Sequence, residues 1–309
     1  MSMAITDDQV RRILREVREN GRISFTEVAG RVGVPRQVVA AVVEEAVAEN
    51  RIRLTATVSP DLLGITRYSY VLISTSGPSE PILEALCAMR ETCFVSAIAG
   101  TYGVDAEVRV TSDEKHQDVL GAIRAIPGVS GVVCNVYERI LVNIDSPLPS
   151  PAATPISFDD ADRSILLALE HNGRATYREL GSAAGVSAAS ARNRLRRLLH
   201  HQVVKVVGLP VRDHLIGPPA LGLGISVHGN VSAALVEEIR VVAPEFLAVS
   251  SGAYDLISTI SADTSEELLA KLDALRGIEQ VNAVDAWSHL RIAKELYGAH
   301  ELFKSVSLP

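Results

Sequence analysis

The feature that most constrains this chain is an internal repeat, because a repeated sequence predicts one structural unit used twice. Asn20-Gly21-Arg22 recurs as Asn172-Gly173-Arg174, at a spacing of 152 residues in a chain of 309. Further matches at this spacing pair Gly33-Val34 with Gly185-Val186, Asp61-Leu62-Leu63 with Asp213-His214-Leu215, and Gly100-Thr101-Tyr102 with Gly252-Ala253-Tyr254. Several ordered matches at one spacing indicate two copies of the same unit.

The spacing changes near the end of each copy. Pro127-Gly128-Val129 aligns with Arg276-Gly277-Ile278 at 149 residues, which predicts that the second copy has lost three residues. Between the copies, prolines stand at positions 147, 149, 151 and 155. Because proline interrupts helices and sheet ladders, this segment is expected to be an extended linker.

Each copy begins with a pattern typical of three helices. In the second copy, Thr176 and Glu179 form a capping box, which predicts a helix start. Gly185 ends this short helix, and Ser187 is a suitable N-cap for a third helix that runs to Leu198 or the next residue. Two short helices joined by a tight glycine turn are typical of a helix-turn-helix.

After the helices, the apolar period shifts toward 2, which indicates strands alternating with helices. In the first copy the predicted strands are 68–74, 94–99, 104–110 and 132–136, and the predicted helices are 83–89 and 119–126. In the second copy the strands are 221–227, 246–249, 256–260 and 281–284, and the helices are 235–242 and 268–275. Each copy therefore has the order βαββαβ, a ferredoxin-like unit.

Two segments of the second copy resemble the Lrp/AsnC family of transcription regulators. They are the turn Gly252-Ala253-Tyr254-Asp255-Leu256 and the helix Ser187–Leu198, which is similar to that family's recognition helix. The resemblance implies an α+β fold of two repeats, each a winged helix-turn-helix domain followed by a ferredoxin-like βαββαβ ligand-sensing domain. It also implies sequence-specific DNA binding and sensing of a small metabolite such as an amino acid.

These patterns predict five segments. They are a degenerate helix-turn-helix at 1–56, a first sensing domain at 57–145, a Pro-rich linker at 146–156, a basic DNA-binding helix-turn-helix at 157–208 and a second sensing domain at 209–309. No apolar run approaches the ~20 residues of a membrane-spanning helix. No basic segment precedes an apolar one at the N-terminus, so we expect a cytoplasmic protein without a membrane partner.

The two candidate recognition helices differ in charge. Residues 187–201 contain four arginines and no acid, whereas residues 35–49 contain Arg36 and three glutamates. Because the net charge of the chain is −7, a DNA-binding surface has to be local. We therefore expect the second helix to bind DNA and the first to have lost direct contact. The first helix would instead offer four valines to its surroundings: Val38, Val39, Val42 and Val43.

The predicted DNA-binding residues are Ser187, Ala189, Ser190, Arg192, Asn193, Arg194, Arg196 and Arg197. The N-terminal end of a recognition helix usually reaches base edges. Arg192 and Arg196, four residues apart, share a face, whereas Arg194 lies well round the helix and is a candidate for bracing the domain. The alternative interpretation is a solvated basic face. The capping box, turn glycine and cap serine before the arginines favour DNA.

The resemblance also implies effector binding near the glycine turn of each sensing domain. The candidate residues are Gly100, Thr101, Tyr102, Gly103, Gly252, Ala253, Tyr254 and Asp255. Gly103 stands where the second copy has Asp255, so the two sites are expected to differ. The alternative is that these glycines merely allow tight turns and the tyrosines merely pack.

No cofactor or metal is expected, and the chain is expected not to be an enzyme. The three cysteines form no CxxC pair, the histidines show no HxH or HExxH spacing, and Gly222-x-Gly224 falls inside a strand, where it is not a phosphate loop. Sirohaem decarboxylases resemble the same family and pair two such units. Their segment rich in histidine and arginine is absent from 94–103 and 246–255. A second alternative is a ligand-binding or partner-binding module without DNA.

The expected partners are double-stranded DNA, a small effector and further copies of the chain. Two sensing domains in one chain could form an internal pseudo-dimer. With one DNA-binding helix per chain, a homodimer or higher homo-oligomer would be needed to bind a palindromic site. Its half-sites would lie ~34 Å apart or a multiple of that distance.

Overall fold

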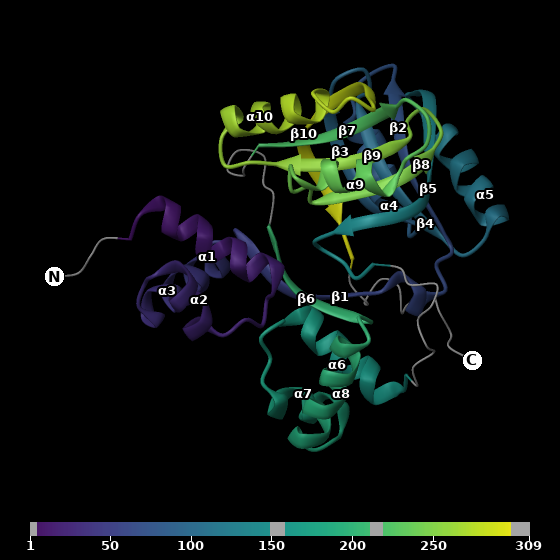
Figure 1. Cartoon of the computed structure of the whole chain (residues 1–309). Helices are drawn as coiled ribbons and strands as arrows, with labels where there is room; N and C mark the ends of the chain where they lie inside the picture. The colour runs from purple at the N-terminus through teal and green to yellow at the C-terminus, as the bar shows by residue number, and fades with distance from the viewer. Residues whose placement is uncertain (1–4, 149–157, 211–218, 298–309) are drawn as a thin grey trace. The chain divides into compact units, whose positions relative to one another are not determined.

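The computed structural model describes residues 5–148, 158–210 and 219–297, which form two compact units (Figure 1). The head unit contains residues up to 62 and residues 145–211, and the barrel unit contains residues 63–144 and 212–296. Each unit takes one part from each copy, so the two copies pair within both units. Most of the predicted linker at 146–156 lies outside the described residues.

The head unit contains the two predicted helix-turn-helix domains. The first head comprises α1 (Asp7–Glu19), α2 (Phe25–Val32), α3 (Arg36–Ala48) and β1 (Ile52–Val58). The second head comprises α6 (Asp160–His171), α7 (Tyr177–Ala184), α8 (Ala188–His200) and β6 (Val204–Pro210). As expected, Thr176 and Glu179 form a capping box, and Ser187 accepts a hydrogen bond from the N–H of Ser190. The prediction of a helix-turn-helix in each copy is confirmed.

The two heads are joined by their wing strands. β1 pairs antiparallel with β6, and the register is centred on Thr55 opposite Val207. These two residues are 152 positions apart and are therefore equivalent in the repeat. A pair of equivalent residues at the centre of an antiparallel ladder places a pseudo-twofold axis between the heads.

The repeated Asn-Gly-Arg motif clamps the heads together about this axis. Arg22 donates from Nη1 to the carbonyl oxygens of Gly173 and Ala175, at 2.8 and 3.0 Å. Arg174 donates in return from Nη2 to the carbonyl oxygen of Ile23, at 2.8 Å. The sequence element that revealed the repeat is therefore a structural contact between the copies.

Glycine is required in the motif because the two backbones approach closely. A Cβ atom on Gly173 would lie 2.9 Å from backbone atoms of Leu54 and Thr55 in β1. The N–H of Gly173 donates to the carbonyl oxygen of Leu54 at 2.9 Å. A larger residue would force the wing of the other copy away and weaken this hydrogen bond.

The barrel unit contains both predicted βαββαβ units. The first copy comprises β2 (Arg67–Thr75), α4 (Glu80–Ala88), β3 (Thr92–Ala99), β4 (Val104–Val110), α5 (Asp113–Arg124) and β5 (Val129–Asn143). The second copy comprises β7 (Ala220–Val227), α9 (Ala233–Arg240), β8 (Phe246–Ser251), β9 (Leu256–Ser261), α10 (Ser265–Arg276) and β10 (Val281–Glu295). The strands close into one barrel in the order β10-β3-β4-β2-β5-β8-β9-β7.

The two final strands hold the barrel together because each one crosses to the other copy. β5 pairs with β2 of its own copy and with β8 of the second, while β10 pairs with β7 and with β3. Both strands are 15 residues long, far beyond the predicted 132–136 and 281–284. Register shifts interrupt each crossing half, so the alternation that marks a strand is lost there.

The repeat spacing of 152 residues holds to the end of both copies. The starts of α5 and α10, and of β5 and β10, are all separated by this distance. The predicted loss of three residues is therefore wrong. Gly128 lies in a turn with φ of +92°, whereas Gly277 is the C-cap of α10. The shared helix pattern was concealed because His116 occupies a buried position that Leu268 occupies in the second copy.

The helices cover the outside of the barrel, and each copy has its own apolar layer. Strand residues such as Val71 and Val95 pack with Leu83 and Ile123 of the first-copy helices. Leu223 and Leu256 pack in the same way in the second copy. Because side chains alternate along a strand, the remaining positions face the barrel interior. None of the described helices is long and apolar enough to cross a membrane.

The barrel interior contains a buried polar network centred on Asp105, which is fully buried. Its carboxylate accepts hydrogen bonds from Tyr70, from Ser96 Oγ at 2.6 Å and from Trp287 Nε1 at 3.1 Å. His289 Nδ1 lies 3.5 Å from the same carboxylate. These donors come from both copies and offset the cost of burying a polar carboxyl group.

The barrel does not repeat this network at the equivalent positions of the two copies. At the positions equivalent to Tyr70, Ser96 and Asp105, the second copy has Gly222, Ala248 and Ile257. The indole of Trp287 occupies the space that a side chain at Gly222 would need, since a Cβ atom there would lie 2.1 Å from Nε1. The Gly222-x-Gly224 pair therefore has a packing role. The ring of Tyr254 lies against Gly224 in the same way.

We predict that Gly222→Ala destabilises the barrel, because the new methyl group forces the indole away from Asp105. The expected loss is about 1–3 kcal/mol. Trp287 is the only tryptophan of the chain, so thermal unfolding followed by its fluorescence reports this change directly. Gly121→Ala is the matched control: this glycine lies in α5 with nothing within 4 Å of a Cβ atom. Equal melting temperatures for the two variants would contradict the prediction.

Candidate nucleic-acid interface and effector pocket

The side chains of α8 fall into three groups. Ala191, Leu195 and Leu198 are buried in the head. Arg194 and Arg197 are half-buried. The exposed face contains Ala188, Ala189, Arg192, Asn193 and Arg196. Of the predicted DNA-binding residues, Ala189, Arg192, Asn193 and Arg196 are therefore on one accessible face.

Two of the four arginines brace the head from within. Arg194 donates from Nη1 to Asp159 at 2.8 Å and to Asp162 at 3.0 Å, and Arg197 also binds Asp162. The Asp162 side chain is only 1% exposed, so it depends on these partners. Hydrogen bonds to Asp162 and Asp159 raise the pKa of Arg194. The expectation that Arg194 braces the domain agrees with this geometry, and Arg197, predicted as a DNA contact, does the same.

The first head has an apolar pair where the second has this ion pair. Val42 stands at the position of Arg194, and Val10 stands at the position of Asp162. Both valines belong to the core of the first head. Replacing a buried ion pair by an apolar pair of similar shape is often neutral for stability. The valine at position 42 therefore shows that the first head is stabilised by an apolar contact in place of an ion pair. It is not evidence that α3 has lost contact with DNA.

The prediction that α3 offers four valines to its surroundings is wrong. Val39, Val42 and Val43 are buried in the head's own core, and Val38 is half-buried. The valines of α3 follow the helical period and therefore face the head's own core. The outward positions equivalent to the exposed face of α8 are Arg36, Gln37, Ala40, Ala41 and Glu44. This face has no net charge, against two positive charges on α8.

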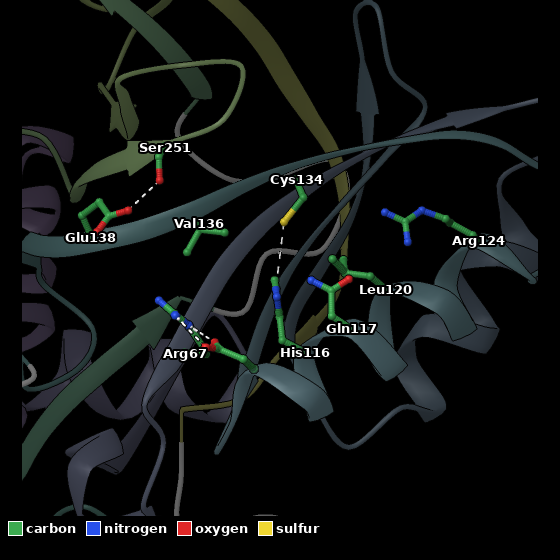
Figure 2. Close-up of a pocket in the computed structure, with 10 residues that line it drawn as sticks. Arg67, His116, Gln117, Leu120, Arg124, Cys134, Val136, Glu138 and Ser251 are labelled. Carbon is green, nitrogen blue, oxygen red and sulfur yellow. Dashed lines mark hydrogen bonds and ion pairs between the residues drawn. The ribbon is translucent and has the colours of Figure 1, made fainter.

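A separate pocket of about 590 Å³ lies on the outside of the barrel (Figure 2). It is formed by α5, β2, β5 and the end of β8. The lining residues are Arg67, Asp113, His116, Gln117, Leu120, Arg124, Cys134, Val136, Glu138 and Ser251. None of these residues was predicted as a site residue, because they become neighbours only when α5 packs on the sheet and β8 of the other copy pairs with β5.

His116 forms the floor of this pocket. Its Nε2 atom lies 2.8 Å from Ser69 Oγ and 4.0 Å from Cys134 Sγ. Figure 2 shows the ring pointing from α5 toward Cys134, with Arg67 and Arg124 on either side. Burial, with the nearby Arg67 cation, lowers the pKa of His116. The histidine is therefore neutral near pH 7 and presents a polar, uncharged surface.

The second copy does not repeat this lining. At the positions equivalent to His116, Gln117 and Glu138 it has Leu268, Leu269 and Leu290. Leu269 and Leu290 are 54% and 56% exposed. The polar pocket is thus a feature of the first copy.

The predicted effector-binding turns are held by specific hydrogen bonds. Asn135 Oδ1 accepts from the N–H groups of Ala253 and Tyr254, at 2.9 and 3.2 Å. Asp255 accepts from the N–H of Val227 at 2.8 Å and so caps the end of β7. The pocket lining includes Ser251, the residue just before the second turn, but none of the predicted residues 252–255 of that turn. These bonds give the turn a structural role whether or not it binds a ligand.

The turn at residues 100–103 is the first-copy equivalent of the turn at residues 252–255. A Cβ atom on Gly100 would lie 3.3 Å from Trp287 Cβ, and one on Gly103 would lie 2.8 Å from Thr75 Oγ1. Thr101 is exposed, and the nearby Tyr102 is one of the groups that raise the pKa of Tyr254 after burial and Asp285. The described residues contain no group of three or more histidine, cysteine or acidic side chains that could hold a metal ion.

Comparisons with known proteins identify both heads. Residues 158–199 match the AsnC-type helix-turn-helix domain, and residues 6–53 match a winged helix-turn-helix DNA-binding model. The HTH-type transcriptional regulator FL11 of Pyrococcus furiosus is 29% identical over 145 residues, which cover 45% of this chain and 93% of the relative. The proline dehydrogenase transcriptional activator of Rhodobacter capsulatus is 29% identical over 151 residues, which cover 46% and 97%.

A solved structure of a decarboxylase is similar over nearly the full length of the chain. The siroheme decarboxylase NirDL aligns over 96% of both chains, with a TM-score of 0.58 and 14% sequence identity, which shows a shared fold. Two helix-turn-helix heads and two joined βαββαβ units define a tandem helix-turn-helix protein. The second helix-turn-helix domain matches the AsnC type, and just under half of the chain is similar to single-copy helix-turn-helix transcriptional regulators.

We predict that Asp162→Ala destabilises the second head, because it removes the N3 carboxylate of the capping box that Asp159 begins at α6 and leaves Arg194 and Arg197 without their buried partner. The expected loss is on the order of 1–2 kcal/mol, since both arginines can still reach water. Thermal unfolding by circular dichroism measures it. Arg196→Ala, on the exposed face, serves as the control and should unfold like the wild type. A wild-type melting curve for Asp162→Ala would refute the brace.

We also predict a pH effect at His116. Its pKa is lower in the folded chain than in the unfolded chain, so the unfolded state binds more protons as the pH falls below ~6.5. Acidification therefore reduces stability. His116→Leu, which copies Leu268, removes this contribution, and the variant should lose less thermal stability than wild type between about pH 7 and pH 5. Parallel plots of melting temperature against pH would show that His116 contributes nothing.

Proposed function

We propose that this chain is a DNA-binding transcription regulator whose direct contact with the duplex is made by the exposed face of α8. The observation that carries the proposal is that the four arginines of α8 have two different environments. Arg194 and Arg197 are bound to acids of the head, whereas Arg192 and Arg196 are paired with no acid among the described residues. Two exposed guanidinium groups one turn apart remain for a polyanion.

The chemistry of this face suits the major groove. Ala188 and Ala189 occupy the first turn, where small side chains allow the helix to approach base edges closely. Arg192 and Asn193 follow, and arginine and asparagine form bidentate pairs with guanine and adenine. Arg196, one turn later, is placed to offset phosphate charge. The N-cap Ser187 and the half-buried Ser190 fix the start of the helix and complete the predicted set.

We further propose that a small metabolite with both a carboxylate and an amino group binds in the first-copy pocket. Arg124 offers positive charge and Glu138 offers negative charge around the neutral His116. Arg67 forms an ion pair with Asp113 at the edge of the pocket. Glu138 also accepts a hydrogen bond from Ser251 at 2.6 Å, which joins the pocket to the turn that begins at Gly252. The predicted turn residues would then respond to the ligand through this contact.

An enzymatic role has less support. The fold is shared with NirDL, but the segments 94–103 and 246–255, each a strand end and the turn after it, contain neither histidine nor arginine. In the barrel, the side chains of Arg109 and His289 are each only 4% exposed, and Arg109 is bound to Glu107. Groups enclosed in this way are not presented to a large substrate. We therefore propose a regulator that is not an enzyme.

We predict that Arg192→Ala and Arg196→Ala weaken DNA binding and flatten its salt dependence, because each removes a contact to the polyanion. Each lost phosphate contact should reduce the slope of log affinity against log salt by about 0.9. Arg36→Ala, on the equivalent helix of the first head, is the comparison and should have a smaller effect, because Glu44 on the same face offsets its charge. Mobility-shift titrations of the full chain at several salt concentrations measure both quantities. Equal losses for all three variants would contradict the assignment to α8.

A further inference from the structure

We infer that one chain of this protein covers a complete DNA site that is not palindromic, and that it reads base sequence in only one half of that site. The inference rests on the proposed DNA binding and concerns the form of the partner. It differs from the expectation that two chains are needed, because the structure supplies the second head within the chain.

The two heads already form a closed pair. The ladder between β1 and β6 runs over seven residue pairs, from Ile52 opposite Pro210 to Val58 opposite Val204. The strand edges by which the heads join are thus occupied by the other copy of the same chain. A second chain is not required to complete either wing.

The clamp around this ladder is reciprocal. Besides its two hydrogen bonds, Arg22 places its guanidinium 5.5 Å from the ring centre of Tyr177, and Arg174 lies 4.1 Å from the ring centre of Phe25. Tyr177 and Phe25 are the first residues of α7 and α2. Each arginine therefore holds the helix that precedes the other copy's recognition helix, and the two recognition helices are related by the pseudo-twofold axis.

The axis relates two helices whose exposed faces are chemically different. Arg192 has Ala40 as its counterpart, and Arg196 has Glu44. A symmetric duplex site would present the same bases and phosphates to both helices. The α3 face has no side chain that repeats the arginine contacts, and Glu44 would repel the phosphate that Arg196 attracts. A duplex DNA site whose two halves differ in sequence is therefore more complementary to α3 and α8 than a palindromic site.

The test is a selection from a pool of random duplexes with the full chain, followed by footprinting and a stoichiometry measurement on the selected duplex. The expected result is one enriched sequence block, a protected region that extends beyond it on one side, and one chain per duplex. A palindromic sequence bound by two chains would overturn the inference while leaving the proposed DNA binding intact. Failure to enrich any duplex would instead contradict DNA binding itself.

A charge reversal tests whether α3 lies against the duplex. Glu44→Arg copies Arg196 onto the first head and should steepen the salt dependence by about 0.9 in the log–log slope, as for one added phosphate contact. Glu49→Arg makes the same charge change at the exposed C-terminal end of α3 and should leave the slope unchanged. Equal slopes for the two variants would show that α3 does not face DNA, and the one-chain site would be wrong.

Discussion

The structure depends on the pairing of strands between the two copies. β5 and β10 continue past their own sheets and form ladders with β8 and β3 of the other copy. Neither sheet is left with an open edge at these seams, because the barrel closes on itself. In the heads, β1 and β6 also pair across the two copies, as a two-stranded sheet. Pairing that separate chains would otherwise provide is thus built into one polypeptide.

Once both copies are in one chain, each can change without changing the other. A homodimer must place the same residue on both sides of its axis. Here Asp105 faces Trp287 and Ser96 on one side, while the equivalent of Asp105 is Ile257. The outer pocket with His116 and the exposed face of α8 also occur once each. Within the part of the chain that the structure describes, the polar network, the polar pocket and the cationic face of α8 are not repeated at the equivalent positions of the other copy.

Much of the fold could be predicted from local sequence signals. Capping residues such as Thr176 and Ser187 act on their own helix, and the apolar alternation of 104–110 reports a strand directly. The second halves of β5 and β10 could not be predicted, since their partners lie far away in sequence and bulges break their alternation. The spacing error arose where His116 replaced a leucine-type core residue and hid the common helical period.

The sequence by itself determined the repeat, the order of elements in each copy and the greater positive charge of the second recognition helix. These properties depend on neighbours within a few residues or on simple composition. Only the tertiary structure decided which arginines remain available, because Asp162 lies far from Arg194 along the chain and contacts it only after folding. It also decided that Asn-Gly-Arg is a clamp, since the atoms it binds belong to the other copy.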